Sequence, residues 1–242
     1  MKVARVFLFV LLIVPGYHLG SSLARADDVK ERAFPAPNNV TIKLRMEGPY
    51  TADVPLQVVC YFKYTVAAAK KMTGSPVELD KLLGGVIASL RERGQFVGNR
   101  LETLLIIPPP NSIKAKALLL VGLGDEESLS TDVMQEVGTV SLREAARLGY
   151  TRVAFAPLIR DQGNSKLPTS DVEIAVLNGV LLAYDTEKRL QKEGYAKPYT
   201  LEAWEVEAGS AYFDDTASGV QKGIDQAAKA IADRGTEPLR QK

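Results

Sequence analysis

The sequence predicts an α/β protein, a three-layer α/β/α sandwich built around a mixed sheet. Segments with the two-residue periodicity of strands alternate with segments of helical periodicity through most of the chain, which places helices on both faces of a sheet. The run 117–121 is continuously apolar, as in a strand covered on both faces. The first two expected strands follow each other without a helix, so the sheet is expected to be mixed.

Residues 1–26 have the three parts of a secretory signal peptide. Lys2 and Arg5 form a positive start, residues 6–14 are an apolar run, and Ala24-Arg25-Ala26 is a cleavage site. The apolar run is too short to span a bilayer, which takes about 20 residues; an uncleaved anchor is the alternative. We therefore expect cleavage after Ala26, a periplasmic or secreted protein with no membrane attachment after cleavage, and a flexible polar leader over 27–39.

The rest of the chain, 40–242, is expected to form one domain, because no repeat or long linker divides it. Residues 40–46 alternate between apolar and polar like a half-buried strand, and 56–62 form a second strand. A helix is expected from the N-cap Ser75 and the following proline to Gly94. Another strand, 101–107, ends at a run of prolines, which cannot continue a ladder.

The second half of the chain continues this alternation. The strand 117–121 leads into a helix that begins after the N-cap Ser130 and ends at the C-terminal capping residue Gly149. A short central strand is expected at 153–156. The last expected elements are a helix from Thr169 or Ser170, an edge strand at 199–206 and an amphipathic helix at 215–234.

Charge and residue usage exclude several kinds of function. The chain has 30 basic and 29 acidic residues, with no clustered basic run, so nucleic acid and anionic membranes are not expected partners. The single histidine, His18, lies in the expected signal peptide. The mature protein would therefore lack Ser-His-Asp or Cys-His catalysis, a histidine-bound zinc and a histidine pH switch. The single cysteine, Cys60, lies in an apolar run and is expected to be a buried structural thiol.

A glycine turn between strand and helix is the first candidate ligand site. Gly122 and Gly124 could let backbone amides approach a phosphate at the start of the next helix. However, Glu127 replaces the third glycine of G-x-G-x-x-G, and Asp125 begins a run of carboxylates where a pyrophosphate would lie. The alternative is that the glycines only allow a tight turn off the sheet.

Five segments occur in an informative order: 94–98 (GQFVG), 118–130 (LLLVGLGDEESLS), 143–149 (REAARLG), 153–157 (VAFAP) and 179–184 (GVLLAY). In order and spacing they resemble the N-terminal domain of the leucyl aminopeptidase (cytosol aminopeptidase) family. The resemblance extends over most of 40–239 and implies a macro-domain-like fold. In that family two metal ions are bound by a lysine and carboxylates of the C-terminal domain, in a motif similar to N-T-D-A-E-G-R, which this sequence lacks. The resemblance therefore implies a fold and no peptidase site.

A second loop is expected beside the glycine turn. Asp161 and Gly163 follow the strand that ends at Ala156, so parallel strands would bring them to the same carboxyl edge as the turn. We expect a cleft for a small polar ligand there. No metal or cofactor is expected, because consecutive carboxylates more often face solvent or cap helices. The candidate ligand-binding residues are Gly122, Gly124, Asp125, Asp161 and Gly163, and the acidic clusters set aside as metal sites are 125–127, 214–215 and Asp161 with Asp171.

These observations leave three functions open. The first is an exported, non-catalytic binding or assembly module; the family resemblance implies oligomer formation, so a homo-oligomer or a protein partner is expected. The second is a binder of ADP-ribose or a related nucleotide, suggested by the fold alone. The third is a hydrolase, either acting through its own carboxylates or serving as an aminopeptidase accessory subunit with a separate catalytic chain.

Overall fold

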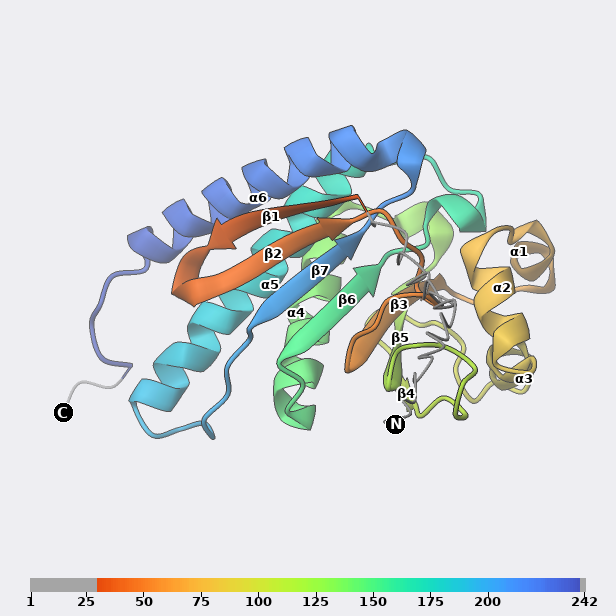
Figure 1. Ribbon diagram of the computed structural model, residues 1–242, viewed down its shortest axis with the longest axis horizontal. Helices are drawn as coiled ribbons and strands as arrows, with labels where there is room; N and C mark the ends of the chain where they lie inside the picture. Colours follow the sequence, from red (N-terminus) through yellow and green to blue (C-terminus); the bar gives the residue numbers. More distant parts are fainter. Residues whose placement is uncertain (1–29, 240–242) are drawn as a thin grey trace, which may run out of the picture.

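The computed structural model describes residues 30–239, and the expected signal peptide lies outside this range. Its centre is a seven-stranded sheet of order β1-β2-β7-β6-β3-β5-β4, in which β1 with β2 and β4 with β5 are antiparallel and the other pairs are parallel (Figure 1). The predicted mixed sheet is therefore confirmed. The strands are β1 (Glu31–Ala36), β2 (Val40–Arg45), β3 (Leu56–Phe62), β4 (Thr103–Ile106), β5 (Ala117–Gly124), β6 (Arg152–Ala156) and β7 (Ala203–Glu207).

Helices cover the two faces unequally. Three long helices lie side by side behind the sheet in Figure 1, whereas three short ones gather beside β3 and β5. The three-layer α/β/α arrangement is thus confirmed, with a second helical layer that covers only part of its face. The long helices are α4 (Thr131–Leu148), α5 (Thr169–Lys192) and α6 (Phe213–Asp233), and the short ones are α1 (Val66–Lys71), α2 (Ser75–Leu82) and α3 (Val86–Glu92).

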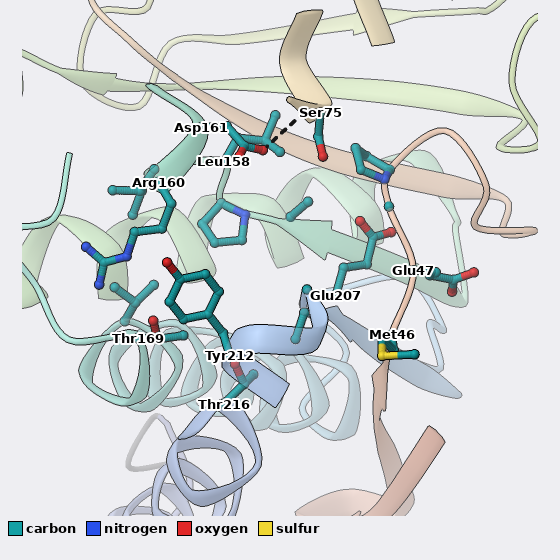
Figure 2. Close-up of a pocket in the computed structure, with 18 of the residues that line it drawn as sticks. Met46, Glu47, Ser75, Leu158, Arg160, Asp161, Thr169, Glu207, Tyr212 and Thr216 are labelled. Carbon is teal, nitrogen blue, oxygen red and sulfur yellow. Dashed lines mark hydrogen bonds between the residues drawn. The ribbon is translucent and has the colours of Figure 1, made fainter. Parts of the chain in front are cut away.

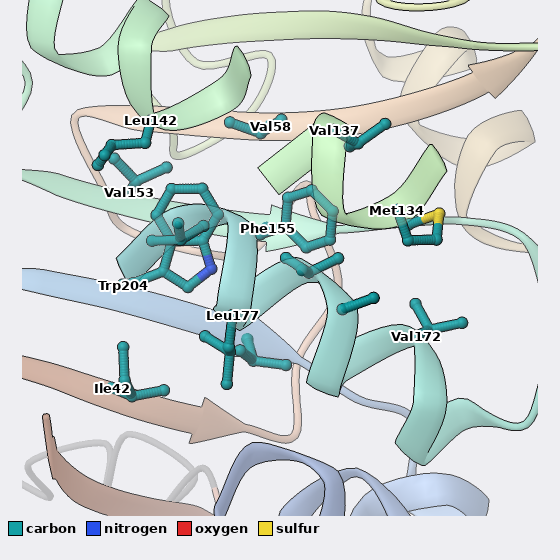
Figure 3. Close-up of a cluster of buried hydrophobic side chains, with 14 of the residues drawn as sticks. Ile42, Val58, Met134, Val137, Leu142, Val153, Phe155, Val172, Leu177 and Trp204 are labelled. Carbon is teal, nitrogen blue, oxygen red and sulfur yellow. The ribbon is translucent and has the colours of Figure 1, made fainter. Parts of the chain in front are cut away.

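Alternate residues of the central strands build two separate cores. Trp204 of β7 and Phe155 of β6 lie in the larger core beneath α4, α5 and α6, with ring centroids 5.7 Å apart (Figure 3). Neighbouring positions such as Val59 and Tyr61 of β3 face the smaller core beneath α2 and α3. Burial on both faces explains why these strands are apolar at successive positions. Cys60 is fully buried in the larger core, as expected.

The helix expected between Ser75 and Gly94 is interrupted. Gly84 and Gly85 have φ angles of +70° and +81°, which no helix contains, and they separate α2 from α3. The carboxylate of Asp80 accepts hydrogen bonds from the first amides of α3, at 2.8 Å from the Ile87 nitrogen. The N-cap of α2 is Gly74, and Ser75 begins the helix, one residue earlier than predicted.

Two predictions about β1 and β7 are wrong. The segment expected as a flexible leader contains β1, whose Phe34 packs on the larger core. The strand expected at an edge is β7, which lies between β2 and β6. Its alternating pattern has another cause: Glu205 is fully buried in a network with Arg45 and Arg152, each with a nitrogen 3.1 Å from a Glu205 oxygen.

The boundaries of α4 follow the sequence closely. The Ser130 hydroxyl accepts a hydrogen bond from the Val133 amide at 3.3 Å, and Gly149 ends the helix with a left-handed φ of +79°. Over residues 30–239 the structure contains no helix of the length and apolar character needed to cross a bilayer.

Candidate functional site

The glycine turn at the end of β5 is a packing device. The backbones of Gly122 and Asn99 approach so closely that a Cβ on Gly122 would lie 1.9 Å from the Asn99 carbonyl oxygen, and only glycine fits at this position. The Gly124 amide donates to the Gly98 carbonyl at 3.0 Å, and its own carbonyl accepts from the Lys63 amide at 2.8 Å. The amides of both glycines are therefore used within the protein, since the Gly122 amide donates to the Glu102 carbonyl at 2.8 Å. The exposed Asp125 side chain lies 3.4 Å from the Lys63 ammonium.

The loop after β6 does lie beside the glycine turn, as predicted. The Lys166 ammonium donates to the Glu127 carbonyl at 2.8 Å, and the Asn164 amide contacts the Glu126 carboxylate at 3.4 Å. The space at the end of β3, which runs between β5 and β6, is filled by Gln162. Its side chain accepts from the Phe62 amide and donates to the Cys60 carbonyl, both at 3.0 Å. Gln162 therefore occupies the end of β3, between the two loops where the cleft was expected.

A cavity opens on the opposite side of the loop after β6. Its volume is about 510 Å³, within the range of about 300 to 1,000 Å³ that is typical of ligand pockets. Three connections meet there: the loop from β2 to β3, the loop from β6 to α5, and the turn from β7 to α6. Figure 2 shows Arg160 and Tyr212 on one side of this cavity and Glu47 on the other, with Glu207 between them. The cavity lies where the carboxyl ends of β2, β6 and β7 meet, the usual ligand position in such sheets.

One of the five predicted site residues lines this cavity. Asp161 does so, and its carboxylate accepts a hydrogen bond from the Ser75 amide at the start of α2, at 3.2 Å. Gly163 ends the short turn 160–162 with a φ of +84° and lies outside the lining, as do Gly122, Gly124 and Asp125. The structure thus brings Asp161 to the cavity and leaves the glycine turn on the far side of Gln162.

Two glutamates carry the unusual chemistry of the cavity. Glu173, near the N-terminus of α5, is 2% exposed, and Glu207, the last residue of β7, is 8% exposed. Both oxygens of Glu207 and the Oε2 atom of Glu173 lack a hydrogen-bond partner of good geometry among the described residues. The hydroxyl of Thr216 on α6 also lacks one. Buried polar groups are nearly always paired, because leaving one unpaired costs about 1 to 3 kcal/mol.

Burial changes the protonation of both carboxyl groups. It raises the pKa of Glu173 to about 8, because the charged form loses its hydration without gaining a cation. Burial also raises the pKa of Glu207 well above its ordinary value, and the negative charge of Glu47 adds to this effect, while Gln57 and Arg45 act in the opposite direction. Glu173 is therefore largely neutral near pH 7 when the cavity holds no cation, and burial favours the neutral form of Glu207 as well.

These two glutamates were missed in the sequence, although one left a signal. Glu173 precedes Val176, Leu177 and Val180 at helical spacings of three, four and seven, so it occupies a position on the apolar face of its helix. Glu207 merely continues the alternation of β7 and has no comparable signal.

The acidic clusters noted in the sequence have structural partners. Asp214 lies 3.0 Å from the Arg32 guanidinium, and Asp215 accepts a hydrogen bond from the Ser170 amide at the start of α5, at 3.2 Å. Within residues 30–239 no group of three or more His, Cys, Asp or Glu side chains is arranged to hold a metal ion.

Known proteins resemble this chain in sequence and in fold. Residues 58–192 match the N-terminal domain of the cytosol aminopeptidase family. A probable cytosol aminopeptidase of Pseudomonas syringae pv. syringae is 34% identical over 92 residues, which are 38% of this chain and 18% of that protein. This chain therefore spans less than a fifth of that relative's length.

Two solved structures share the fold at low sequence identity. A mutant of tomato leucine aminopeptidase superposes with a TM-score of 0.59 and 17% identity over 83% of this chain and 38% of that one. A macrodomain of Oceanobacillus iheyensis with ADP superposes with a TM-score of 0.52 and 11% identity over 86% of this chain and 99% of that one. Since the family match covers more than half of the sequence and the fold agrees with it, this chain belongs to the cytosol aminopeptidase family, through its N-terminal domain.

Proposed function

We propose that this chain is an exported, non-catalytic module that binds a small polar ligand in the cavity at the carboxyl ends of β2, β6 and β7. The observation that carries the proposal is the set of buried polar groups on Glu173, Glu207 and Thr216, which line the cavity without partners among the described residues. Such groups are costly in an empty site, and a ligand with matching polar atoms offsets that cost.

A thermal-shift screen of small polar compounds, followed by calorimetry of those that respond, tests this proposal. Ligands should raise the melting temperature of the wild type, and Thr216→Val should weaken the response, because it removes one unpartnered hydroxyl at nearly constant volume. Asp161→Ala should also weaken it, through the loop that forms one wall. Asp125→Asn, outside the cavity, serves as the control. The proposal is wrong if no compound stabilises the wild type.

Export is supported by the signal-like pattern of residues 1–26. Expression of the full chain with its native N-terminus, followed by fractionation and N-terminal sequencing, should give a periplasmic or secreted protein that begins at Asp27. A cytoplasmic protein that retains its N-terminus would contradict this part of the proposal.

The non-catalytic role and an assembly role have separate tests. The purified protein should not cleave a leucine anilide with added manganese; cleavage that is lost on chelation would favour a hydrolase. Size-exclusion chromatography with light scattering tests self-association, and a monomer that captures no catalytic aminopeptidase chain would count against an assembly role.

Nucleotide binding is the second candidate, because the macrodomain with ADP shares the fold. Calorimetry with ADP-ribose tests it directly. Against it stand the carboxyl groups of Glu173, Glu207 and Glu47 along the cavity, which would repel a diphosphate whenever they are ionised.

A further inference from the structure

We propose that the ligand of this cavity is a small organic cation, a primary ammonium group attached to an apolar body, held by the carboxylates of Glu173 and Glu207. This inference rests on the proposed binding function and adds the chemical class of the ligand. It follows from three features: the acidic side chains of the cavity, the hydrogen bonds that already engage the helix N-terminal amides beside it, and its apolar walls.

The carboxyl oxygens are poorly satisfied within the protein. Oε2 of Glu173 and both oxygens of Glu207 have no hydrogen-bond partner of good geometry among the described residues, and Gln57 and Arg45 favour the charged form of Glu207 without outweighing its burial. Glu173 of α5 and Glu207 of β7 both line the cavity and are more than nine-tenths buried. An ammonium group has three donors and a positive charge, so it can satisfy such oxygens and neutralise their charge together. A neutral ligand would supply hydrogen bonds without the charge.

The same cavity is poorly suited to an anion, although two helices begin beside it. The Ser75 amide at the start of α2 donates to Asp161, and the Ser170 amide at the start of α5 donates to Asp215. These carboxylates occupy positions that a bound phosphate would otherwise take. The guanidinium of Arg160 is also engaged, since it donates to the carbonyls of Asn164 and Leu167.

The walls suit an apolar body next to the ammonium group. Aliphatic side chains of α5 and of the segments that follow β2, β6 and β7 line the cavity. The ring of Tyr212, which is 44% exposed, lies at its rim. A tyrosine ring can also contact a cation through its face. The apolar residues that line the cavity include Met46, Ala156, Pro157, Leu158, Val172 and Ala208.

Binding of a cation should release protons. The empty site keeps Glu173 neutral up to about pH 8, and a bound ammonium favours its ionised form. The ionisable groups around the two carboxyls are Cys60 of β3 near Glu173, and Glu47, Glu205 and Arg45 near Glu207. Arg160 and Asp161 line the cavity from the loop after β6, and Tyr50 and Tyr212 from the loops after β2 and β7. Release of one proton makes the affinity rise by up to about tenfold per pH unit below the pKa of the released group.

Isothermal titration calorimetry of the full domain tests the inference with matched pairs of probes. We would titrate 2-phenylethylamine, butylamine and 1,4-diaminobutane, each against the alcohol of the same skeleton, at pH 6.5 and pH 8. We expect at least one amine to bind at least about tenfold more tightly than its alcohol, and at least about fivefold more tightly at pH 8 than at pH 6.5. The apparent enthalpy should depend on the ionisation enthalpy of the buffer, which reports the released proton in the wild type.

Variants locate the site, and the outcomes separate the two proposals. Glu173→Gln and Glu207→Gln should each weaken amine binding at least about tenfold, and Glu173→Gln should remove most of the pH dependence, whereas the surface change Glu127→Gln should alter neither. If a variant does not fold, the dependence of the wild-type binding enthalpy on the buffer still shows whether amine binding releases a proton. Binding of an alcohol or of ADP-ribose in preference to every amine overturns the cation inference and leaves the binding function standing. The absence of any ligand overturns both.

Discussion

Replacing Glu173 with glutamine should change how the stability of the domain depends on pH. The pKa of Glu173 rises from its ordinary 4.5 to about 8 in the folded protein because the carboxyl is buried without a cation. Between these two values the unfolded chain loses the proton while the folded protein keeps it, so folding becomes less favourable as the pH rises. Each pKa unit corresponds to about 1.4 kcal/mol. The contribution of Glu173 therefore lowers the free energy of unfolding by on the order of 5 kcal/mol as the pH rises from 4.5 to 8.

Glutamine keeps the shape of the side chain and does not ionise. The free energy of unfolding of Glu173→Gln minus that of the wild type, measured by urea denaturation, should therefore increase steadily from pH 5 to pH 8 and level off above it. Glu127→Gln, on the exposed loop after β5, should show no such trend. A difference that stays constant within about 1 kcal/mol across this range would refute the assignment of a buried, unpaired Glu173.

Three further substitutions test particular contacts, each by urea denaturation. Gly122→Ala places a Cβ 1.9 Å from the Asn99 carbonyl oxygen and should cost at least about 3 kcal/mol, whereas Gly209→Ala, with open space around it, should stay within about 1 kcal/mol of the wild type; equal effects would contradict the packing role of the turn. Gln162→Ala leaves backbone groups of β3 unpaired and should cost about 2 to 4 kcal/mol, with faster exchange of the Phe62 amide hydrogen; unchanged exchange would contradict the hydrogen bond from this amide to Gln162. Asp80→Ala removes the acceptor at the start of α3 and should cost about 1 to 2 kcal/mol, and a smaller loss than about 0.3 kcal/mol would show that the cap contributes little.

Local sequence determined much of the framework. The continuously apolar β5 and the helix between Ser130 and Gly149 were predictable because periodicity and capping act within a few residues along the chain. The break between α2 and α3 had its signal in Gly84 and Gly85, whose apolar neighbours on both sides suggested one continuous helix.

Only the tertiary structure decided where β7 lies and where the cavity forms. The alternation of β7 indicated a polar face, and an edge strand satisfies that pattern as well as an inner strand whose Glu205 meets Arg45 and Arg152. Nothing local distinguishes the two, because those arginines are far away in the sequence. The same holds for Gln162, which binds the end of β3 where a cleft was expected, and for the placing of Glu173 and Glu207 along one cavity elsewhere. Periodicity determines which residues share a face, whereas the strand order determines which faces and loops meet, and that order depends on long-range packing.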